Sequence, residues 1–379
     1  MSKLIGKKTL LPAGFSDILY PKSENQYLIV EKILNFFANF SYFRIKPPII
    51  EFEDTLFAKG PGSVLKENSF RIMDPISQKM MALRSDMTTQ ISRIASSRMF
   101  HYPRPLRLSY SGDVLRVKSS TLNMDRQITQ VGAEIIGDVN GDLEAEIILI
   151  GLKTLEHLNI NDLSIDLNFP KLNEMLLKNC PKHIANKILL GIEKKDFKSI
   201  QNIEFSNKSE ILNLMNTSGK FTNKSKYLKS LTANNKNNQS IQYLINIAEK
   251  IKNNFSSINV ILDPLDMNSF KYHDGITFTI FANGVRAGIA KGGSYKTITK
   301  ENATGISIYT ERLNNLIDLT AKRKMVLLKS LDFESADNLI KKGFVISFID
   351  TTNEKHILKV AREMKCDYVL NNNKLEKVN

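Results

Sequence analysis

The chain has 379 residues, of which 42% are hydrophobic and 24% are charged, and it carries a formal net charge of +14. This is an ordinary globular composition with room for two or three domains, and no apolar run approaches the roughly 18 residues that span a bilayer. The N-terminus lacks the apolar core of a signal peptide, and Cys180 and Cys366 form neither a disulfide framework nor a metal-binding pattern, so we expect a cytoplasmic protein without a metal or other cofactor.

The first 168 residues predict alternating helices and strands of one α+β domain. A Gly/Pro-punctuated lead-in over 11–21 precedes a helix over 24–39 whose N-cap is Ser23. Periodicity then predicts, in chain order, an extended segment over 43–52, a strand over 78–84, a helix over 86–99, antiparallel strands over 105–118 and 126–138 joined by a polar loop at 119–125, a helix over 142–158 and a strand over 163–168.

The composition changes after residue 168. Residues 169–257 hold helical stretches such as SIQYLINIAEKIKN, separated by Asn/Lys/Ser-rich connectors, and we interpret them as a helical insertion. Strands resume over 258–263, in a hairpin over 276–293 with Asn283-Gly284 at its turn, and over 303–309. We therefore predict a core of residues 1–168 and 258–320 that the insertion interrupts.

Residues 321–379 follow a different pattern. The segments KMVLLKS, ESADNLIKKG, FVISFID, NEKHILKVAREMK and CDYVL predict the order β-α-β-α-β. Such alternation is typical of a small parallel sheet covered by helices. We expect a small C-terminal α/β domain.

Polar side chains gather on and beside the predicted antiparallel strands. A free amino acid needs a carboxylate or amide for its ammonium group, an arginine for its carboxylate and polar partners for its side chain. All three kinds are present in Arg84, Asp86, Thr88, Arg116, Gln130, Glu134, Tyr272 and His273. Nine of the 13 arginines lie between Arg44 and Arg126, and arginine offers planar, bidentate donors. The lysines are spread with asparagines along the whole chain, which favours compositional drift over a nucleic-acid-binding face.

Each of these residues also has a structural interpretation. Asp86 is a good helix N-cap, and Arg116 can belong to a solvated strand face. Gln130 and Glu134 are four residues apart and share a strand face whether or not that face binds a ligand. His273 alone is typical of a structural histidine. The pattern by itself favours a ligand pocket without establishing one.

Eight segments occur in an order that resembles the class II aminoacyl-tRNA synthetases, in the histidyl-tRNA synthetase branch. They are LPAGFSD, KPPIIE, ALRSDMT, VLRVK, RQITQVGAEIIG, FKYHDG, KGGSY and TGISIYTERL, within residues 1–168 and 258–315. KPPIIE resembles motif 1, whose proline lies at a dimer interface, PLRLSYSGDVLRVK resembles motif 2, and TGISIYTERL resembles motif 3. The resemblance implies an antiparallel sheet flanked by helices that works as a dimer.

Four departures from that family pattern imply that aminoacylation is lost. Asn268 stands where histidyl-tRNA synthetases have an arginine that stabilises charge on the reacting groups, and an amide cannot replace that cation. The motif 2 glutamate that helps to hold ATP is Lys118, and the second glycine of motif 3 is Tyr309, whose ring would occupy space that the nucleotide needs. Only 67 residues follow Arg312, which is short for an anticodon-binding domain.

The residues that match the family's histidine pocket remain. They are Asp86, Met87 and Thr88 at its Glu-Gly-Thr segment, Arg116 at the motif 2 arginine, Gln130 and Glu134 at its ammonium and imidazole contacts, and Tyr272 and His273 at its Tyr-Tyr pair. GGSYK departs from the family's GGRYD, which leaves the support of the pocket there open. This pattern and the short α/β tail resemble the ATP phosphoribosyltransferase regulatory subunits, a family of synthetase paralogues.

That resemblance implies a subunit without catalytic residues, acting at the first step of L-histidine biosynthesis. It implies a short-form ATP phosphoribosyltransferase catalytic subunit as partner, a homodimer core within a hetero-octamer, and histidine as a feedback ligand, with neither a membrane nor a nucleic acid as partner. Two other interpretations stay open: a divergent histidyl-tRNA synthetase, and a tRNA-binding paralogue that kept the fold and the positive charge.

Overall fold

The computed structural model of the chain describes residues 10–58, 60–118, 124–232, 238–266, 272–351, 353–371 and 374–378. The chain forms two compact units, Met1–Asp318 and Leu319–Asn379. Two predicted features lie outside the described residues, namely most of the polar loop, at 119–123, and the amide of Asn268. The eight ligand residues predicted from the sequence are all described, and all lie in the first unit.

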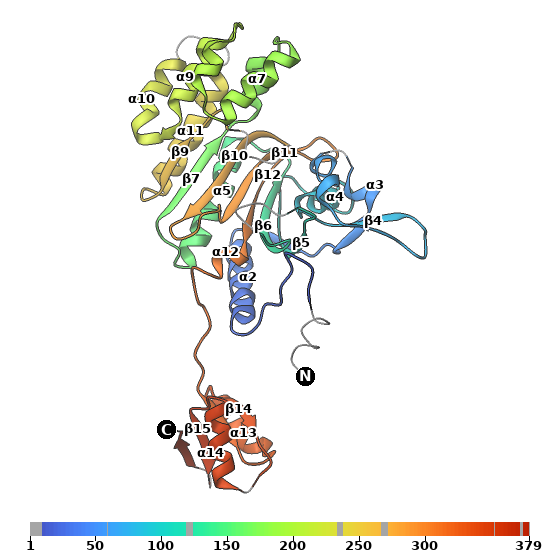
Figure 1. The fold of residues 1–379 in the computed structure, drawn as a ribbon, viewed down its shortest axis with the longest axis vertical. Helices are drawn as coiled ribbons and strands as arrows, with labels where there is room; N and C mark the ends of the chain where they lie inside the picture. Colours follow the sequence, from blue (N-terminus) through green and yellow to red (C-terminus); the bar gives the residue numbers. More distant parts are fainter. Residues whose placement is uncertain are drawn as a thin grey trace. The chain divides into compact units, whose positions relative to one another are not determined.

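The first unit is built on one mixed sheet that has nine strands in the described part of the chain (Figure 1). Across the sheet they are β1 (Phe43–Ile45), β5 (Leu106–Leu115), β6 (Gln127–Ile136), β12 (Asn302–Tyr309), β11 (Ala290–Lys296), β10 (His273–Ala282), β7 (Leu163–Asn168), β9 (Asn259–Leu262) and β8 (Gly219–Lys220). Neighbours pair antiparallel except β1 with β5 and β7 with β9. The antiparallel pair predicted over 105–118 and 126–138 is confirmed as β5 and β6.

The two faces of this sheet differ, because successive residues of a strand point to opposite sides. On β6, Val131 and Ile135 are fully buried on one face. That face is covered by α5 (Gly141–His157) and α2 (Lys22–Ala38), as Figure 1 shows. Gln130 and Glu134 point to the other face, as their spacing predicts, so the candidate site lies on the side away from α5.

An apolar cluster packs against the face of the sheet that carries Gln130 and Glu134. It joins α4 (Thr88–Ser97) and the residue before it to the central strands, and contains Met87, Ile91, Ala95, Leu106, Leu108, Tyr110, Val114, Ile128, Ile136, Tyr295, Ala303 and Tyr309. Burial of this much apolar surface fixes the polar groups between these residues in place.

Two predicted local features can be compared with the structure, and one of them is wrong. Helix α2 begins at Lys22 with Pro21 in the cap position, so Ser23 lies in its first turn and is not the N-cap. The fixed φ of proline suits a helix start, which makes a side-chain cap unnecessary there. The hairpin of β10 and β11 is confirmed with Asn283-Gly284 in a turn that the Val285 N–H and the Ala282 carbonyl close, although the whole connection is longer, because β10 ends at Ala282 and β11 begins only at Ala290. Gly284 still has a positive φ of 87° within this longer connection.

The helical insertion predicted between β7 and β9 consists of short helices. They are α6 (Lys171–Leu177), α7 (Lys182–Glu193), α8 (Phe197–Gln201), α9 (Lys208–Thr217), α10 (Phe221–Thr232) and α11 (Asn238–Asn254). The two-residue strand β8 lies between α9 and α10 and pairs with β9, an addition that the sequence did not predict.

A smaller sheet follows motif 1 in the chain. In the described residues it has the strand order β2 (Ile50–Phe52), β4 (Met80–Leu83) and β3 (Arg71–Met73). Short helical segments accompany it: α3 (Glu53–Leu56) and the 3-10 turns η1 (Pro61–Val64) and η2 (Lys66–Asn68), while α12 (Thr310–Leu313) follows β12.

The second unit confirms the predicted β-α-β-α-β order. Its elements are β13 (Met325–Leu328), α13 (Phe333–Lys341), β14 (Val345–Phe348), α14 (Glu354–Glu363), β15 (Tyr368–Asn371) and β16 (Lys374–Lys377). β13 pairs parallel with β14 and β15, and the unpredicted β16 adds an antiparallel edge. None of the helices in the described ranges is long and apolar enough to cross a membrane.

Leu108→Ala should lower the free energy of unfolding by about 2–5 kcal/mol, because Leu108 is fully buried in the cluster under the site. Chemical denaturation followed by circular dichroism measures this change. Leu19→Ala is the matched control, since Leu19 is 73% exposed and its truncation should change stability by less than about 0.5 kcal/mol. Equal effects of the two substitutions would contradict the placement of the core.

Candidate ligand-binding site

The face of the sheet that carries Glu134 holds a narrow cavity of about 10 Å³, which is room for about one water molecule. Four of the eight predicted ligand residues line it, namely Thr88, Glu134, Tyr272 and His273. Lys291, Tyr295 and Ser307 also line it, together with three glycines. The other four predicted residues, Asp86, Met87, Arg116 and Gln130, are not part of the lining.

Glycines form the floor of the cavity where the strands cross it. Gly293 on β11 pairs with Gly305 on β12, which pairs with Glu134 on β6. A Cβ atom at Gly305 would lie 1.8 Å from Oε2 of Glu134. Only glycine therefore leaves room for the Glu134 carboxyl group at this point.

The Glu134 side chain is 1% exposed and accepts hydrogen bonds from hydroxyl groups on α4, β5 and β11. Its Oε1 accepts hydrogen bonds from Thr88 Oγ1 at 3.0 Å and from the Tyr110 hydroxyl at 3.2 Å. Its Oε2 accepts one from the Tyr295 hydroxyl at 3.1 Å. Burial raises the pKa of Glu134 to about 8, although the Thr88 hydroxyl opposes this rise. The group is thus a buried acid that is mostly protonated at neutral pH.

A directed chain of hydrogen bonds leads from Gln130 to Glu134. The amide nitrogen of Gln130 donates to Ser307 Oγ, and the hydroxyl groups of Ser307 and Tyr110 lie 3.1 Å apart. Because Tyr110 donates its proton to Glu134, the Ser307 hydroxyl is left to donate to Tyr110. Gln130 therefore acts behind the cavity wall and fixes the orientation of the Glu134 partners.

Asp86 and Met87 precede helix α4 and contribute differently from each other. Asp86 is 1% exposed, and its Oδ1 accepts the backbone N–H of Thr88 at 2.8 Å, but it is not the N-cap that the sequence suggested, because Met87 occupies the cap position of α4. Its Oδ2 is buried and accepts no hydrogen bond from a described residue. Burial raises the pKa of Asp86, and the nearby Arg116 guanidinium opposes the rise. Met87 packs in the apolar cluster and donates its backbone N–H to Gln130 Oε1.

Arg116 lies at the edge of the site with part of its guanidinium group unused. Its Nε donates to the Ser85 carbonyl at 3.3 Å, whereas its Nη2 is buried and has no hydrogen-bond partner among the described residues. Arg84, which the sequence grouped with it, instead donates to backbone carbonyls such as that of Asp113. Arg84 is therefore a structural residue, while Arg116 retains a free donor.

Tyr309 fills the space between two arginines. Its ring is 2% exposed, with the Arg312 guanidinium 4.5 Å and the Arg116 guanidinium 5.9 Å from its centre. Such cation–π contacts hold both side chains against the ring. The nearby Lys118 is exposed, and its backbone N–H donates to the Asn68 side chain.

Aromatic rings form one wall of the cavity. The rings of Tyr272 and His273 lie 4.6 Å apart, and Tyr272 meets Tyr295 edge-on at 6.0 Å. Burial raises the pKa of Tyr272, so its phenol stays neutral. A wall of this kind suits a flat, weakly polar ring.

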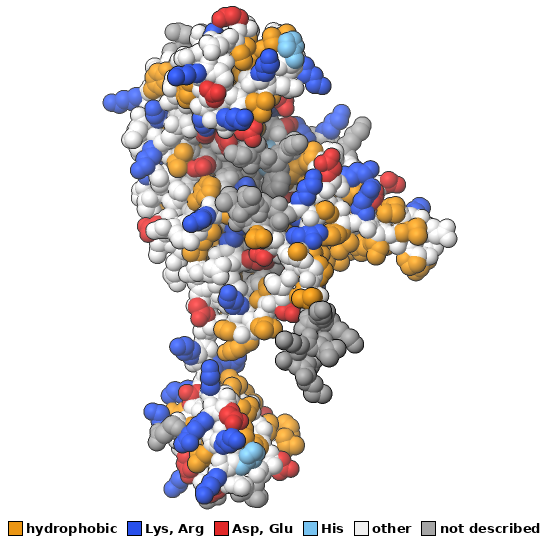
Figure 2. Space-filling view, in the orientation of Figure 1, with side chains coloured by type: hydrophobic (Ala, Val, Ile, Leu, Met, Phe, Trp, Pro, Cys, Tyr) orange, Lys and Arg blue, Asp and Glu red, His pale blue; other side chains and the backbone are white. Residues whose placement is uncertain are grey.

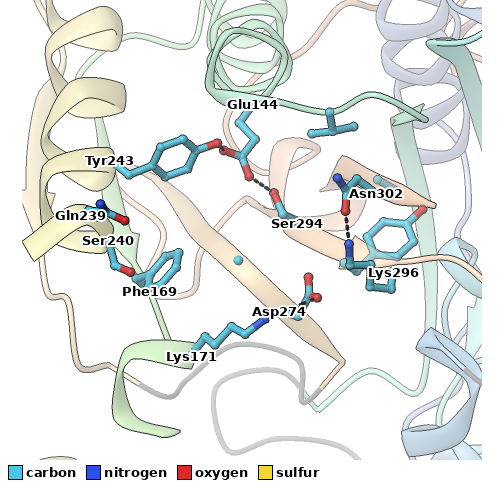
Figure 3. A pocket seen from close by; sticks show the side chains of 14 residues that line it. Glu144, Phe169, Lys171, Gln239, Ser240, Tyr243, Asp274, Ser294, Lys296 and Asn302 are labelled. Atoms are coloured by element: carbon cyan, nitrogen blue, oxygen red, sulfur yellow. Dashed lines mark hydrogen bonds and ion pairs between the residues drawn. The ribbon is translucent and has the colours of Figure 1, made fainter. Parts of the chain in front are cut away.

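The GGSYK segment is supported without the arginine found in related families. Ser294 donates a hydrogen bond to Glu144 on α5, and Tyr243 on α11 donates to the same carboxyl group (Figure 3). These residues border a second cavity of about 870 Å³, counted to open solvent, between the insertion and the core. Burial raises the pKa of Glu144. The next residue, Tyr295, points to the opposite face and contacts Glu134.

Sequence reasoning missed four residues of the site, Tyr110, Lys291, Tyr295 and Ser307. All lie on strands that were predicted, but their positions depend on strand register. Lys291 pairs with Ser307, and Tyr110 and Ser307 both pair with Gly132, so three of these side chains lie in one row. No group of three or more potential metal ligands occurs among the described residues.

The chain was compared with known protein families and proteins. A family model described as histidyl-tRNA synthetase matches residues 14–313. An ATP phosphoribosyltransferase regulatory subunit from Rhodospirillum centenum is 34% identical, over 84% of this chain and 83% of the relative. Another of that name from Gluconobacter oxydans is 32% identical, over 95% of each chain.

Solved structures show the same fold. An ATP phosphoribosyltransferase regulatory subunit/histidyl-tRNA synthetase from Bacillus halodurans has a TM-score of 0.78 at 20% identity, over 93% of this chain and 96% of that one. A histidyl-tRNA synthetase from a Nostoc species has a TM-score of 0.76 at 17% identity, over 95% and 90%. The class II synthetase-like fold expected from the sequence is confirmed.

Glu134 should make stability depend on pH. In the folded chain its pKa is about 8, against an ordinary value of 4.5, so the folded state binds the proton more tightly. The stability that this group contributes is complete below about pH 4.5 and is lost as the pH rises through about 8. Between about pH 5 and 8, the wild type should therefore lose unfolding free energy relative to Glu134→Gln, as denaturation at several pH values would measure.

Glu204→Gln is the control for this prediction, because the Glu204 side chain is 91% exposed. Its difference from the wild type should not change over the same range. A constant difference between Glu134→Gln and the wild type would contradict the raised pKa.

Proposed function

The chain belongs to the histidyl-tRNA synthetase-like family of ATP phosphoribosyltransferase regulatory subunits, and on this premise we propose that it binds L-histidine around Glu134 and regulates a separate catalytic subunit. It is a regulatory subunit for the first step of histidine biosynthesis, in which ATP and phosphoribosyl pyrophosphate form phosphoribosyl-ATP on the partner. The proposal places this assembly in the cytoplasm.

The observation that carries the histidine proposal is a pair of oppositely charged groups near Glu134, each with one buried atom that makes no hydrogen bond to a described residue. Oδ2 of Asp86 and Nη2 of Arg116 are buried without a hydrogen-bond partner among the described residues. Buried charges without partners are costly, and a zwitterion would supply an ammonium group for the carboxylate and a carboxylate for the guanidinium. Neither residue lines the cavity, but the Asp86 carboxyl group interacts electrostatically with both Arg116 and Glu134.

The rest of the cavity suits an imidazole. Tyr272 and His273 form the aromatic wall, and the protonated carboxyl group of Glu134 can donate to or accept from a ring nitrogen. The hydroxyl groups on Glu134 are its present partners, so histidine must displace at least one of them. In this proposal Thr88, Gln130 and the backbone of Met87 hold the binding residues in place.

Aminoacylation is lost in this proposal because the nucleotide has no room. The Tyr309 ring lies between Arg116 and Arg312 and is almost completely buried, so a purine and its phosphates could bind there only if this ring moved away. Lys118 reverses the charge that the synthetase family places near ATP. A histidine pocket without a nucleotide pocket can bind the amino acid but cannot activate it.

Regulation then follows from linkage between two sites. Histidine can inhibit the partner only if it binds the less active assembly more tightly than the active one. A coupling of about 1–3 kcal/mol would change affinities by about 5–150-fold. The pocket need not touch the partner's reacting groups for this purpose.

A surface for self-association lies on the sheet that follows motif 1. Phe52, Ile72, Met73, Ile76 and Met80 are between 42% and 93% exposed. Figure 2 shows these apolar side chains gathered on the projecting β2–β4–β3 sheet. Exposed apolar patches of this kind mark interaction surfaces, which supports the homodimer core, and the hetero-octamer built on it, as part of the proposal.

Glu134→Ala should weaken histidine binding by about tenfold or more, because it removes the buried carboxyl group at the centre of the cavity. Titration calorimetry with L-histidine on the full chain measures this affinity. Glu204→Ala, at an exposed glutamate, is the control and should bind as the wild type does. Unchanged affinity of Glu134→Ala would remove the pocket assignment.

The purified chain should activate a short-form ATP phosphoribosyltransferase and make it sensitive to histidine. Transferase assays of the partner alone and of the complex, with and without histidine, measure both effects. A partner that is equally active and equally histidine-sensitive alone would end the proposal. Histidine-dependent exchange between ATP and pyrophosphate by the chain itself would favour a divergent synthetase instead.

A further inference from the structure

Lys291 is a pocket residue to which neither the sequence pattern nor the family resemblance pointed. It lies on β11 and lines the same cavity as Glu134 and Thr88. Residues 291, 293 and 295 of this strand share a face, and Tyr295 of this row contacts Glu134 directly. The Lys291 side chain therefore belongs to the binding face of the sheet.

The strand register places Lys291 and Glu134 at opposite ends of the cavity. Gly293, two residues after Lys291, pairs with Gly305, and Gly305 pairs with Glu134. Two strand spacings and one two-residue step separate the Cα atoms of Lys291 and Glu134, a distance of about 12 Å. Because Gly293 and Gly305 occupy the positions between them, no side chain from these positions fills the space between Lys291 and Glu134, and a small molecule enters it when the hydroxyl partners of Glu134 move aside.

Lys291 and the two arginines whose charges act on it lack a contacting anion in the described part of the chain. Lys291, Arg116 and Arg312 form no ion pair with any carboxylate of the described residues. Burial lowers the pKa of Lys291, and the positive charges of Arg312 and Arg116 lower it further, against a weaker opposing effect of Asp266. An anion bound beside Lys291 would offset the cost of burying its charge. It would also offset the repulsion between Lys291 and the two arginines.

We propose that Lys291 binds the carboxylate of the ligand together with Arg116, so that the pocket selects free α-amino acids. This inference rests on the proposed function and adds the determinant of ligand class. A zwitterion would lie across the glycine floor, with its ammonium group toward the acidic end and its carboxylate toward Lys291. An amino alcohol or an ester would leave the buried ammonium group of Lys291 without a partner, which pockets of this kind reject strongly.

Titration calorimetry on the full chain tests this with two ligands, L-histidine and L-histidinol, whose hydroxymethyl group replaces the carboxylate. The wild type should bind histidinol at least about tenfold more weakly than histidine, or not detectably. Lys291→Met should weaken histidine binding by about tenfold or more, and Lys291→Arg should restore it to within about threefold of the wild type. The conservative rescue separates the charge of Lys291 from its packing.

Lys296→Met is the matched control, because Lys296 is an exposed lysine on the same strand whose side chain lies at the second cavity (Figure 3). It should leave histidine affinity unchanged. Two results would overturn the inference and leave the pocket assignment intact. One is that Lys291→Met binds histidine within threefold of the wild-type affinity, and the other is that the wild type binds histidinol and histidine equally well. If the wild type binds no histidine at all, both the inference about Lys291 and the proposed histidine-binding function fail.

Discussion

The burial of the Glu134 carboxyl group determines how the rest of the site is built. A carboxyl group this deeply buried needs hydrogen-bond donors, and Thr88, Tyr110 and Tyr295 supply them from three different elements. The neighbouring position on β12 cannot carry a side chain, because even a Cβ atom there would overlap the Glu134 carboxyl group. Position 305 must therefore be glycine. The start of α4, the register of β12 and the face of β11 are therefore all fixed by one side chain.

The sequence allowed the strands of the site to be predicted but not their register. Alternation on β6 placed Gln130 and Glu134 on one face, and four of the eight residues suggested by the family pattern line the cavity. Lys291 and Ser307 could not be assigned, because their pairing depends on the register of β11 with β12, which side-chain alternation alone does not fix. The short strands β8 and β16 escaped prediction because neighbouring strands, rather than their own residues, hold them.

Strand β11 connects the cavity to the rest of the first unit. Tyr295 contacts Glu134 on one face, while the preceding Ser294 contacts Glu144 on the other. Glu144 in turn accepts a hydrogen bond from Tyr243 of the insertion. Strand β11 therefore contacts Glu134 on one face and, through Glu144, helices α5 and α11 on the other.

The difference between a sensor and a catalyst explains which features this site keeps. A catalyst must bind its transition state more tightly than its substrate, which demands fixed charges at the reacting atoms. A sensor needs only a difference in affinity between two states of the assembly, so ground-state contacts are enough. The Tyr309 ring fits the second requirement, because it holds Arg116 in place by a cation–π contact without any nucleotide. In the proposed function, the side chain that takes the space of the nucleotide thereby also keeps Arg116 in position.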